Sequence, residues 1–303
     1  MPKALAASLL NWAGSSLRGL GRLDEARQPL AAALNAFSAQ KQWQQAAIAA
    51  ANLSQLLLAL GHIDQALACA RTSIAHAHKS RDEFQQLAER AAEAEALHQA
   101  GRLDQAAAAL AEVEQRQQQL EPAAPRLSAR PGYQYCDLLL SRGQIDEVKA
   151  RAEQTLALAQ AQGWTLAGAL DRLALGRAYL AGSGQVDLQT AGAFLDKACE
   201  GLQQERALEY LVPAWLARAE WFQRQGRWSA AQADIFAALE LAGRTGMKLF
   251  ACDAHLAQAR LALAQGSPES ARAPLDQARA LIQATGYGRR EQEAAALETT
   301  FLT

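Results

Sequence analysis

Cysteine and histidine are the residue types best suited to nucleophilic or metal chemistry, and their spacing here assembles no such site. His76 and His78 are two residues apart, an offset that points them in different directions on a helix. A disulfide framework or a zinc site would cluster the cysteines. The four cysteines instead lie dozens of residues apart: Cys69, Cys136, Cys199 and Cys252. We therefore expect four reduced, mostly buried thiols and no metal site.

The motifs of nucleotide and acyl chemistry are also missing from the sequence. The densest glycine cluster, Gly182-Ser183-Gly184, follows no predicted strand and matches no phosphate-binding loop, so we interpret it as a loosened turn. A Gly-x-Ser-x-Gly nucleophile motif does not occur. We expect a protein that is not an enzyme and uses no cofactor.

A recurring polar position is the best candidate for binding another molecule. One polar side chain returns about every forty residues within otherwise apolar segments, in the series Ser15, Gln55, Glu95, Asp137, Arg177, Glu220 and Arg260. Opposite charges at equivalent positions of neighbouring repeats predict two exposed ion pairs, Asp137–Arg177 and Glu220–Arg260. Such a column suits recognition of a peptide or protein by shape and charge. The alternative interpretation is that these residues only form the polar floor of a groove and bind no ligand.

Composition narrows the class of protein. The 303 residues are 50% hydrophobic and 20% charged, with 30 Lys and Arg against 31 Asp and Glu. This balance argues against nucleic-acid binding and against disorder. Alanine is abundant, and no apolar run approaches the ~20 residues needed to span a bilayer. We expect an all-α, cytoplasmic protein without a membrane segment, in which Ala4–Leu10 opens an amphipathic helix rather than a signal peptide.

An internal repeat must position the polar column. The phrase Gly-x-Leu/Ile-Asp-x-Ala recurs seven times in exact or loosened form, and successive glycines are 40 to 42 residues apart. The anchor glycines are Gly21, Gly61, Gly101, Gly143, Gly184, Gly226 and Gly266. Apolar residues follow a period near 3.6 on both sides of each anchor, which predicts seven antiparallel helical hairpins. Such hairpins must stack, and we expect a right-handed superhelical solenoid with the first helix of each hairpin on the concave side.

Each residue of the phrase has an expected structural role. The glycine is expected to end the first helix in the left-handed conformation. The apolar residue two places later, such as Leu23 or Val186, is expected to pack under the turn. The Asp that follows is expected to lie at the start of the second helix, where it can accept from free N–H groups.

Three features break or complete the regular pattern. Prolines at 122, 125 and 131 predict a kink or a mobile loop over residues 121–132, followed by a short helix near Gly132–Ser141. The segment 289–301 predicts a capping helix. Aromatic residues recur near the start of first helices, which we interpret as packing between hairpins for Trp43, Phe84, Trp164, Tyr210 and Phe250. We also expect core positions for Trp12, Trp215, Trp221 and Trp228.

The turn phrase resembles that of tetratricopeptide repeats. The fifth unit carries a Leu-Gly-x-x-Tyr first helix at Leu175–Tyr179, while Trp215 and Gly14 match the family's early aromatic and mid-helix glycine. The resemblance covers essentially the whole chain, although the family's standard unit has 34 residues. Long units of this kind resemble arrays on bacterial regulators of the maltose-activator type and on bacterial signalling ATPases.

The resemblance implies a non-enzymatic scaffold or sensor module that binds a protein or peptide in its concave groove. The candidate groove residues are Asn52, Gln55, Glu95, Asp137, Arg177, Glu220 and Arg260. The alternative is a small-ligand or signalling-peptide sensor domain of a bacterial regulator or signalling ATPase. A pocket lined by Tyr133, Tyr135 and Arg177 would favour this alternative. The family's clamp for chaperone-tail carboxylates is absent, since the places of its cations hold Asn11, Ala88 and Ala92.

Overall fold

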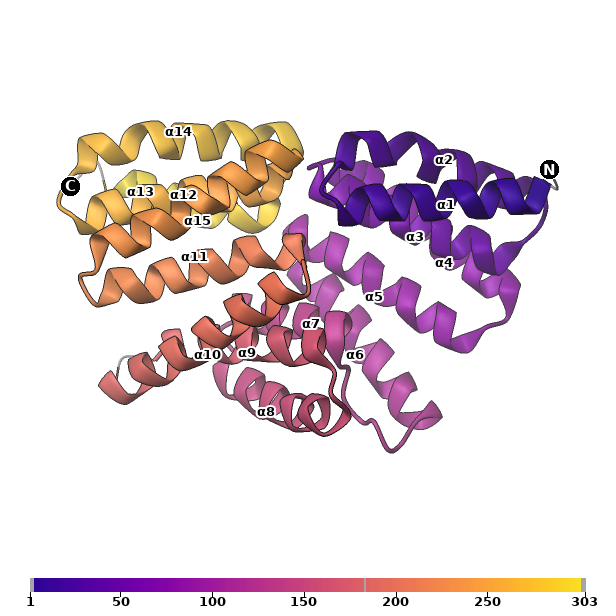
Figure 1. Cartoon of the computed structure of the whole chain (residues 1–303), viewed down its shortest axis with the longest axis horizontal. Coiled ribbons are helices and arrows are strands. Elements are labelled where there is room, and N and C mark those ends of the chain that lie inside the picture. Colours follow the sequence, from indigo (N-terminus) through magenta and orange to yellow (C-terminus); the bar gives the residue numbers. More distant parts are fainter. Residues whose placement is uncertain (1–2, 183, 301–303) are drawn as a thin grey trace. The chain divides into compact units, whose positions relative to one another are not determined.

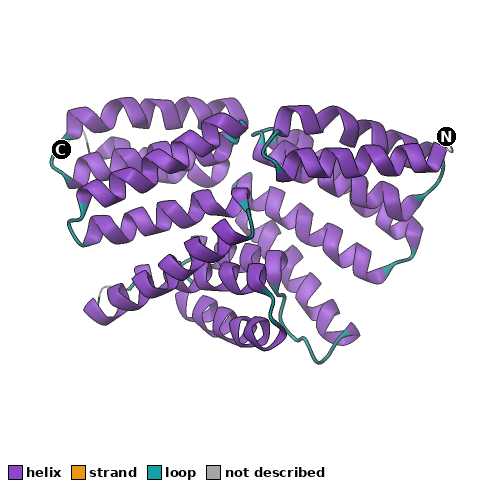
Figure 2. Ribbon diagram, viewed as in Figure 1, coloured by secondary structure: helices purple, strands orange, loops and turns teal. Residues whose placement is uncertain are grey.

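The computed structural model describes residues 3–182 and 184–300, and their regular structure is helical throughout, without a strand (Figure 1, Figure 2). The helices are α1 (Lys3–Gly19), α2 (Leu23–Ala39), α3 (Trp43–Ala59), α4 (Ile63–Ser80), α5 (Glu83–Gln99), α6 (Leu103–Leu120), α7 (Ala129–Ser141), α8 (Ile145–Gln162), α9 (Thr165–Leu180), α10 (Gln185–Gln204), α11 (Leu208–Arg224), α12 (Trp228–Thr245), α13 (Lys248–Ala264), α14 (Pro268–Thr285), the 3₁₀ helix η1 (Gly288–Arg290) and α15 (Glu291–Thr299). The expected all-α class is confirmed.

The chain divides into two compact units. The first unit extends to Pro125 and includes Thr245–Leu249 and Thr285–Arg289. The second unit holds Arg126–Arg244, Phe250–Ala284 and the chain from Arg290 onward. The division between Pro125 and Arg126 falls in the proline-containing segment 121–132.

Consecutive helices pair through turns that end on a left-handed glycine. Six of the seven anchor glycines have φ between 69° and 80°, a conformation that costs glycine little because it has no Cβ. At Gly61 the turn closes with a hydrogen bond from the His62 N–H to the Leu57 carbonyl, 2.8 Å long. This satisfies a carbonyl that the helix end would otherwise leave free. The predicted role of the glycine is confirmed at these six turns.

The fifth turn differs from the prediction. Gly184 has φ −81° and precedes α10 in extended backbone, so it is not the left-handed terminator. Val186, expected under the turn, is 76% exposed. Ser183 lies outside the described residues. The additional turn residue changes the register, so that Val186 falls on the outer face of α10.

The Asp of the repeated phrase lies inside the first turn of the second helix rather than at the position immediately before it. The residue immediately before α2 is Arg22, and its side chain makes no capping hydrogen bond. Asp24 is the second residue of α2 and therefore lies within the first turn. A carboxylate there still stabilises the helix through the partial positive charge of its N-terminus, by about 0.3–1 kcal/mol.

A second series of left-handed residues, between hairpins, was not predicted. Gly163, Gly246 and Gly286 have φ of 69°, 76° and 70°. Lys41, Arg81 and Arg206 adopt φ between 53° and 59° at the equivalent turns. The three glycines are 83 and 40 residues apart, about two repeats and one repeat, and this spacing was the signal in the sequence that could have revealed these turns.

The helix after the proline segment is short, as predicted, but begins earlier. α7 has 13 residues and starts at Ala129 rather than Gly132. Pro131 is thus the third residue of the helix. A proline is tolerated there because the first-turn N–H groups have no partner within the helix.

Leucine and alanine, rather than the aromatic residues, dominate the buried positions. In the second unit Leu170, Leu173 and Leu195 are fully buried and lie in one cluster with many alanines. The predicted burial of Trp12, Phe84, Trp164 and Trp228 is wrong, since they are between 37% and 63% exposed. Three of the four thiols are buried and all four are free, as expected.

The turn glycines offer a matched test of backbone strain. Gly226→Ala is expected to lower the free energy of unfolding by about 1 kcal/mol, because φ is 69° and a Cβ would have no atom within 4 Å. Gly243→Ala, inside α12 with equally open surroundings, is expected to raise it by about 0.5–1 kcal/mol. Urea denaturation followed by circular dichroism measures both, and changes of the same sign would contradict the left-handed assignment.

Candidate functional site

In the first unit, side-chain hydrogen bonds join the polar positions of the first helices α1 and α3. Asn52 of α3 donates from Nδ2 to Asn11 Oδ1 at 3.3 Å and to Ser15 Oγ at 3.4 Å. Arg18 of α1 donates from Nη1 to Gln55 Oε1 at 2.7 Å. On α5, Glu95 accepts a hydrogen bond from Gln99. These residues support one another and form a polar surface along α1, α3 and α5.

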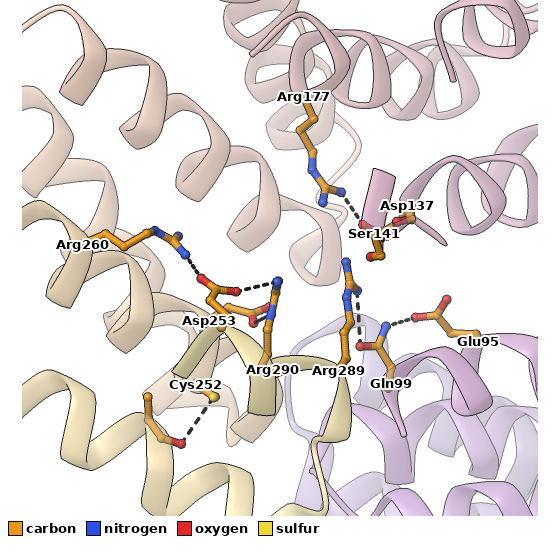
Figure 3. A network of polar contacts seen from close by, with 12 residues as sticks. Glu95, Gln99, Asp137, Ser141, Arg177, Cys252, Asp253, Arg260, Arg289 and Arg290 are labelled. Carbon is orange, nitrogen blue, oxygen red and sulfur yellow. Dashed lines mark hydrogen bonds and ion pairs between the residues drawn. The ribbon is translucent and has the colours of Figure 1, made fainter. Parts of the chain in front are cut away.

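In the second unit, the predicted pair Asp137–Arg177 is confirmed. Arg177 of α9 donates from Nη1 to Asp137 Oδ1 of α7 at 2.6 Å and to the Tyr133 hydroxyl at 3.3 Å (Figure 3). Burial alone would lower the pKa of Arg177, but Asp137 outweighs it and holds that pKa above its ordinary value. The two side chains are 22% and 9% exposed, so the pair is more buried than the exposed ion pair expected.

The second predicted pair, Glu220–Arg260, is not the arrangement observed. The partner of Glu220 among the described residues is Arg224, whose Nη2 lies 2.8 Å from Oε1 one helical turn away on α11. Arg260 of α13 is paired with Glu293 of α15. Burial lowers the pKa of Arg260, and Glu220 opposes that shift through space without direct contact. The prediction is wrong because it treated the hairpins alone, whereas α15 brings a competing carboxylate.

The segment after the last hairpin contributes charged residues that were not among the predicted site residues. Arg290 of η1 reaches Asp253 Oδ1 of α13 with Nε at 2.6 Å. Its Nη1 lies 3.0 Å from Glu293 Oε2, and Glu293 also pairs with Arg260. The sequence signal was the charged run Gly288-Arg289-Arg290-Glu291, which falls outside the repeat register.

These side chains surround a cavity in the second unit. The cavity holds about 510 Å³, within the range usual for ligand sites. Its charged lining consists of four arginines and three carboxylates: Arg177, Arg224, Arg260, Arg290, Glu220, Asp253 and Glu293. Its apolar lining comes chiefly from α9 and α11, from the end of α7 and from the start of α8: Leu140, Ile145, Leu180, Pro213 and Leu216. The cavity can therefore hold apolar and charged groups of one ligand at the same time.

The aromatic part of the expected pocket is assembled only in part. Tyr133 is buried beside Arg177 and packs edge-on against Tyr210, with ring centroids 5.5 Å apart. Tyr135 instead lies under the guanidinium of Arg151 of α8, 4.1 Å from it. Tyr133 therefore contacts Arg177 through its hydroxyl group, while Tyr135 packs against the second helix of its hairpin.

The histidines and acids form no metal centre within the described part of the chain. A search of those residues finds no group of three or more His, Cys, Asp or Glu side chains placed to hold an ion. His76 stacks on Trp43 at 5.5 Å and lies 3.2 Å from Ser38 Oγ, which is a packing role. The described helices also include none with the length and hydropathy of a membrane span.

Two buried carboxyl groups lie away from the cavity. Burial raises the pKa of Asp171 to about 7, although it accepts a hydrogen bond from Thr155 Oγ1 at 2.8 Å. Burial likewise raises the pKa of Glu89 to about 7, despite hydrogen bonds from Ser73 and Gln85. The folded protein binds these protons more tightly than the unfolded chain, whose carboxyls titrate near pH ~4. Stability should therefore fall as pH rises from about 4 to about 7 and stay level above that.

The variant Asp171→Asn should remove the contribution of this residue to that pH dependence. Asn keeps an oxygen for the Thr155 hydroxyl but carries no charge. At pH 8 the free energy of unfolding is expected to rise by about 1–3 kcal/mol, and at pH 5 to change little. Urea denaturation at the two pH values measures this. The exposed Asp146→Asn serves as control, and an equal gain there at pH 8 would contradict the role of burial.

The helices define the class of fold: the described chain is an all-α helical-repeat protein built from consecutive hairpins, a fold like that of tetratricopeptide repeats. A particular solved structure shares this fold. A Rap protein crystallised in complex with competence and sporulation factor matches 99% of this chain and 97% of its own, with a TM-score of 0.61 and 11% sequence identity. No family model matches the sequence. A comparison with curated proteins likewise finds no match.

Proposed function

We propose that the protein is a non-enzymatic recognition module that binds a peptide or an extended protein segment in the cavity of its second unit. The observation that carries the proposal is the cavity of about 510 Å³, in which paired charges from α9, α11, α13 and η1 face an apolar wall. A peptide offers side chains of both kinds along one extended chain. The Rap protein of similar fold was crystallised with competence and sporulation factor, which agrees with this use of the fold.

Glu220, Arg177 and Arg260 are the residues that we expect to select the ligand. Arg177 directs only Nη1 toward Asp137 and Tyr133, so its remaining N–H donors are available to a bound carboxylate or carbonyl. Glu220 is half-exposed on the cavity wall and can accept from a ligand amine. Asp137 acts indirectly, by fixing the orientation of Arg177.

The column of the first unit is proposed as a secondary surface. Asn52, Gln55 and Glu95 are each engaged by neighbouring side chains, and amide groups of this kind can exchange such bonds for bonds to a bound backbone. We propose that these residues offer a separate polar binding surface on the first unit. The free thiols are compatible with a reducing compartment, and we propose that the protein acts in the cytoplasm.

A random peptide library displayed on phage, selected against the full-length chain, tests the proposal. A selected peptide is then labelled, and its dissociation constant is measured by fluorescence polarisation. Glu220→Lys is expected to weaken binding at least about tenfold, because it reverses a charge on the cavity wall. The control is Arg244→Glu, an exposed residue at the end of α12. Equal losses in both variants, or a library that yields no binder, would contradict the proposal.

A small-ligand sensor is the second candidate, and the cavity volume favours it because drug-sized ligands occupy similar spaces. The module would then belong to a bacterial regulator or signalling ATPase. A thermal-shift screen of metabolites distinguishes the two. A small molecule that raises the melting temperature, and loses this effect in Glu220→Lys, would favour the sensor over the peptide-binding scaffold.

A further inference from the structure

Helix α15 buries very little of its own surface. Ala294 is the single buried residue in its nine. In α9, by contrast, eleven of sixteen residues are buried. Between α14 and α15 lies an open space of about 690 Å³, lined by residues such as Ile282, Ala294 and Glu298. Apolar burial therefore contributes little to holding α15 in place.

Ion pairs hold α15 and the preceding η1 instead, and most of them reach the cavity. Glu293 of α15 pairs with Arg260 and Arg290, and Arg290 pairs with Asp253 (Figure 3). These four side chains all line the cavity. At the other end of the helix, Glu298 pairs with Arg279 at the surface, with both side chains about half exposed.

We propose that residues 290–299 form an ionic latch on the binding cavity, and that Arg290 and Glu293 belong to its recognition set. The inference rests on the proposed function of that cavity. A ligand carboxylate that binds Arg260 displaces Glu293, and the loss of this pair releases α15. One carboxylate replaces another on the same guanidinium, so the exchange leaves no buried charge without a partner. Ligand binding would thereby expose the α14 face that α15 covers.

Hydrogen–deuterium exchange of the α15 amides in the full-length chain, without ligand, tests the latch. Glu293→Gln is expected to speed exchange in α15 by about tenfold, because it removes the charge that joins α15 to Arg260 and Arg290. The matched control is Glu298→Gln on the same helix, which removes only the surface pair and should change exchange less than about threefold. The melting temperature should stay nearly constant in both. Equal effects of the two variants, or none, would overturn the latch.

Succinate, used as a carboxylate probe, tests displacement. At equal ionic strength, succinate should speed α15 exchange more than sodium chloride, and Arg260→Gln should abolish the difference. Identical effects of the two salts would overturn the displacement step. These measurements need no natural ligand. If α15 exchange changes as expected but the peptide selection yields no binder, the latch is supported and the proposed peptide binding is not.

Discussion

Arg177→Glu is expected to lower the free energy of unfolding by about 3–5 kcal/mol, the cost typical of breaking a buried ion pair. The substitution places a second carboxylate against Asp137, whose side chain is only 9% exposed, and removes the donor to Tyr133. Neither acid can be solvated well in that position. Urea denaturation of the second unit, followed by tryptophan fluorescence and circular dichroism, measures the loss.

The matched control for this prediction is Arg224→Glu. It also sets two carboxylates against each other, because Arg224 pairs with Glu220, but both side chains are about 40% exposed. We expect a loss of no more than about 1 kcal/mol there. Equal losses in the two variants would mean that burial does not strengthen the Asp137–Arg177 pair. The large expected loss also makes Glu220→Lys the better probe of binding, because it should leave the fold intact.

Gly192→Ala is expected to lower the free energy of unfolding by about 2–4 kcal/mol, an overpacking cost at the upper end of its usual range. A Cβ at Gly192 of α10 would lie 2.1 Å from Cζ2 of Trp221 and 2.3 Å from Cε2. The ring cannot bend away, and moving it breaks the 2.8 Å hydrogen bond from Nε1 to the Leu188 carbonyl. Thermal and urea denaturation measure the loss.

A second glycine within a helix provides the comparison. At Gly168 of α9 a Cβ would lie 3.2 Å from the flexible end of Arg172 and in ordinary van der Waals contact with Leu156 and Ala159, so Gly168→Ala should be neutral or slightly stabilising. A smaller ring should rescue the first variant: Gly192→Ala combined with Trp221→Phe should lose less than the sum of the two single losses. Strict additivity would contradict the proposed clash.

Much of the helical architecture was predictable because its determinants are local. A left-handed glycine such as Gly61 terminates a helix through backbone geometry alone, and the 3.6-residue apolar period defines the buried face of each helix. Asp137 and Arg177 were predicted to pair because equivalent places in neighbouring hairpins must face each other in a stack. Gly184 shows the limit, since one additional turn residue changed the conformation that the repeat implied.

Aromatic positions and turns between hairpins were harder to predict. Trp164 recurs at a repeat position yet is 48% exposed, because periodicity shows that a position repeats but not how deeply it is buried. Arg81 adopts φ 59° without being glycine, a strain that the surrounding packing supports and that the residue type does not announce.

The sequence by itself determined the helices, most of their ends and the polar column that they carry, since these depend on residues close together in the chain. Only the tertiary structure decided which charges meet in the cavity. Arg260 pairs with Glu293 rather than Glu220 because the segment after the last hairpin folds back onto α13. A guanidinium forms its ion pair with the carboxylate that the packing of the helices brings nearest to it. That choice depends on contacts between distant segments, and the repeat pattern contains no information about a helix outside its register.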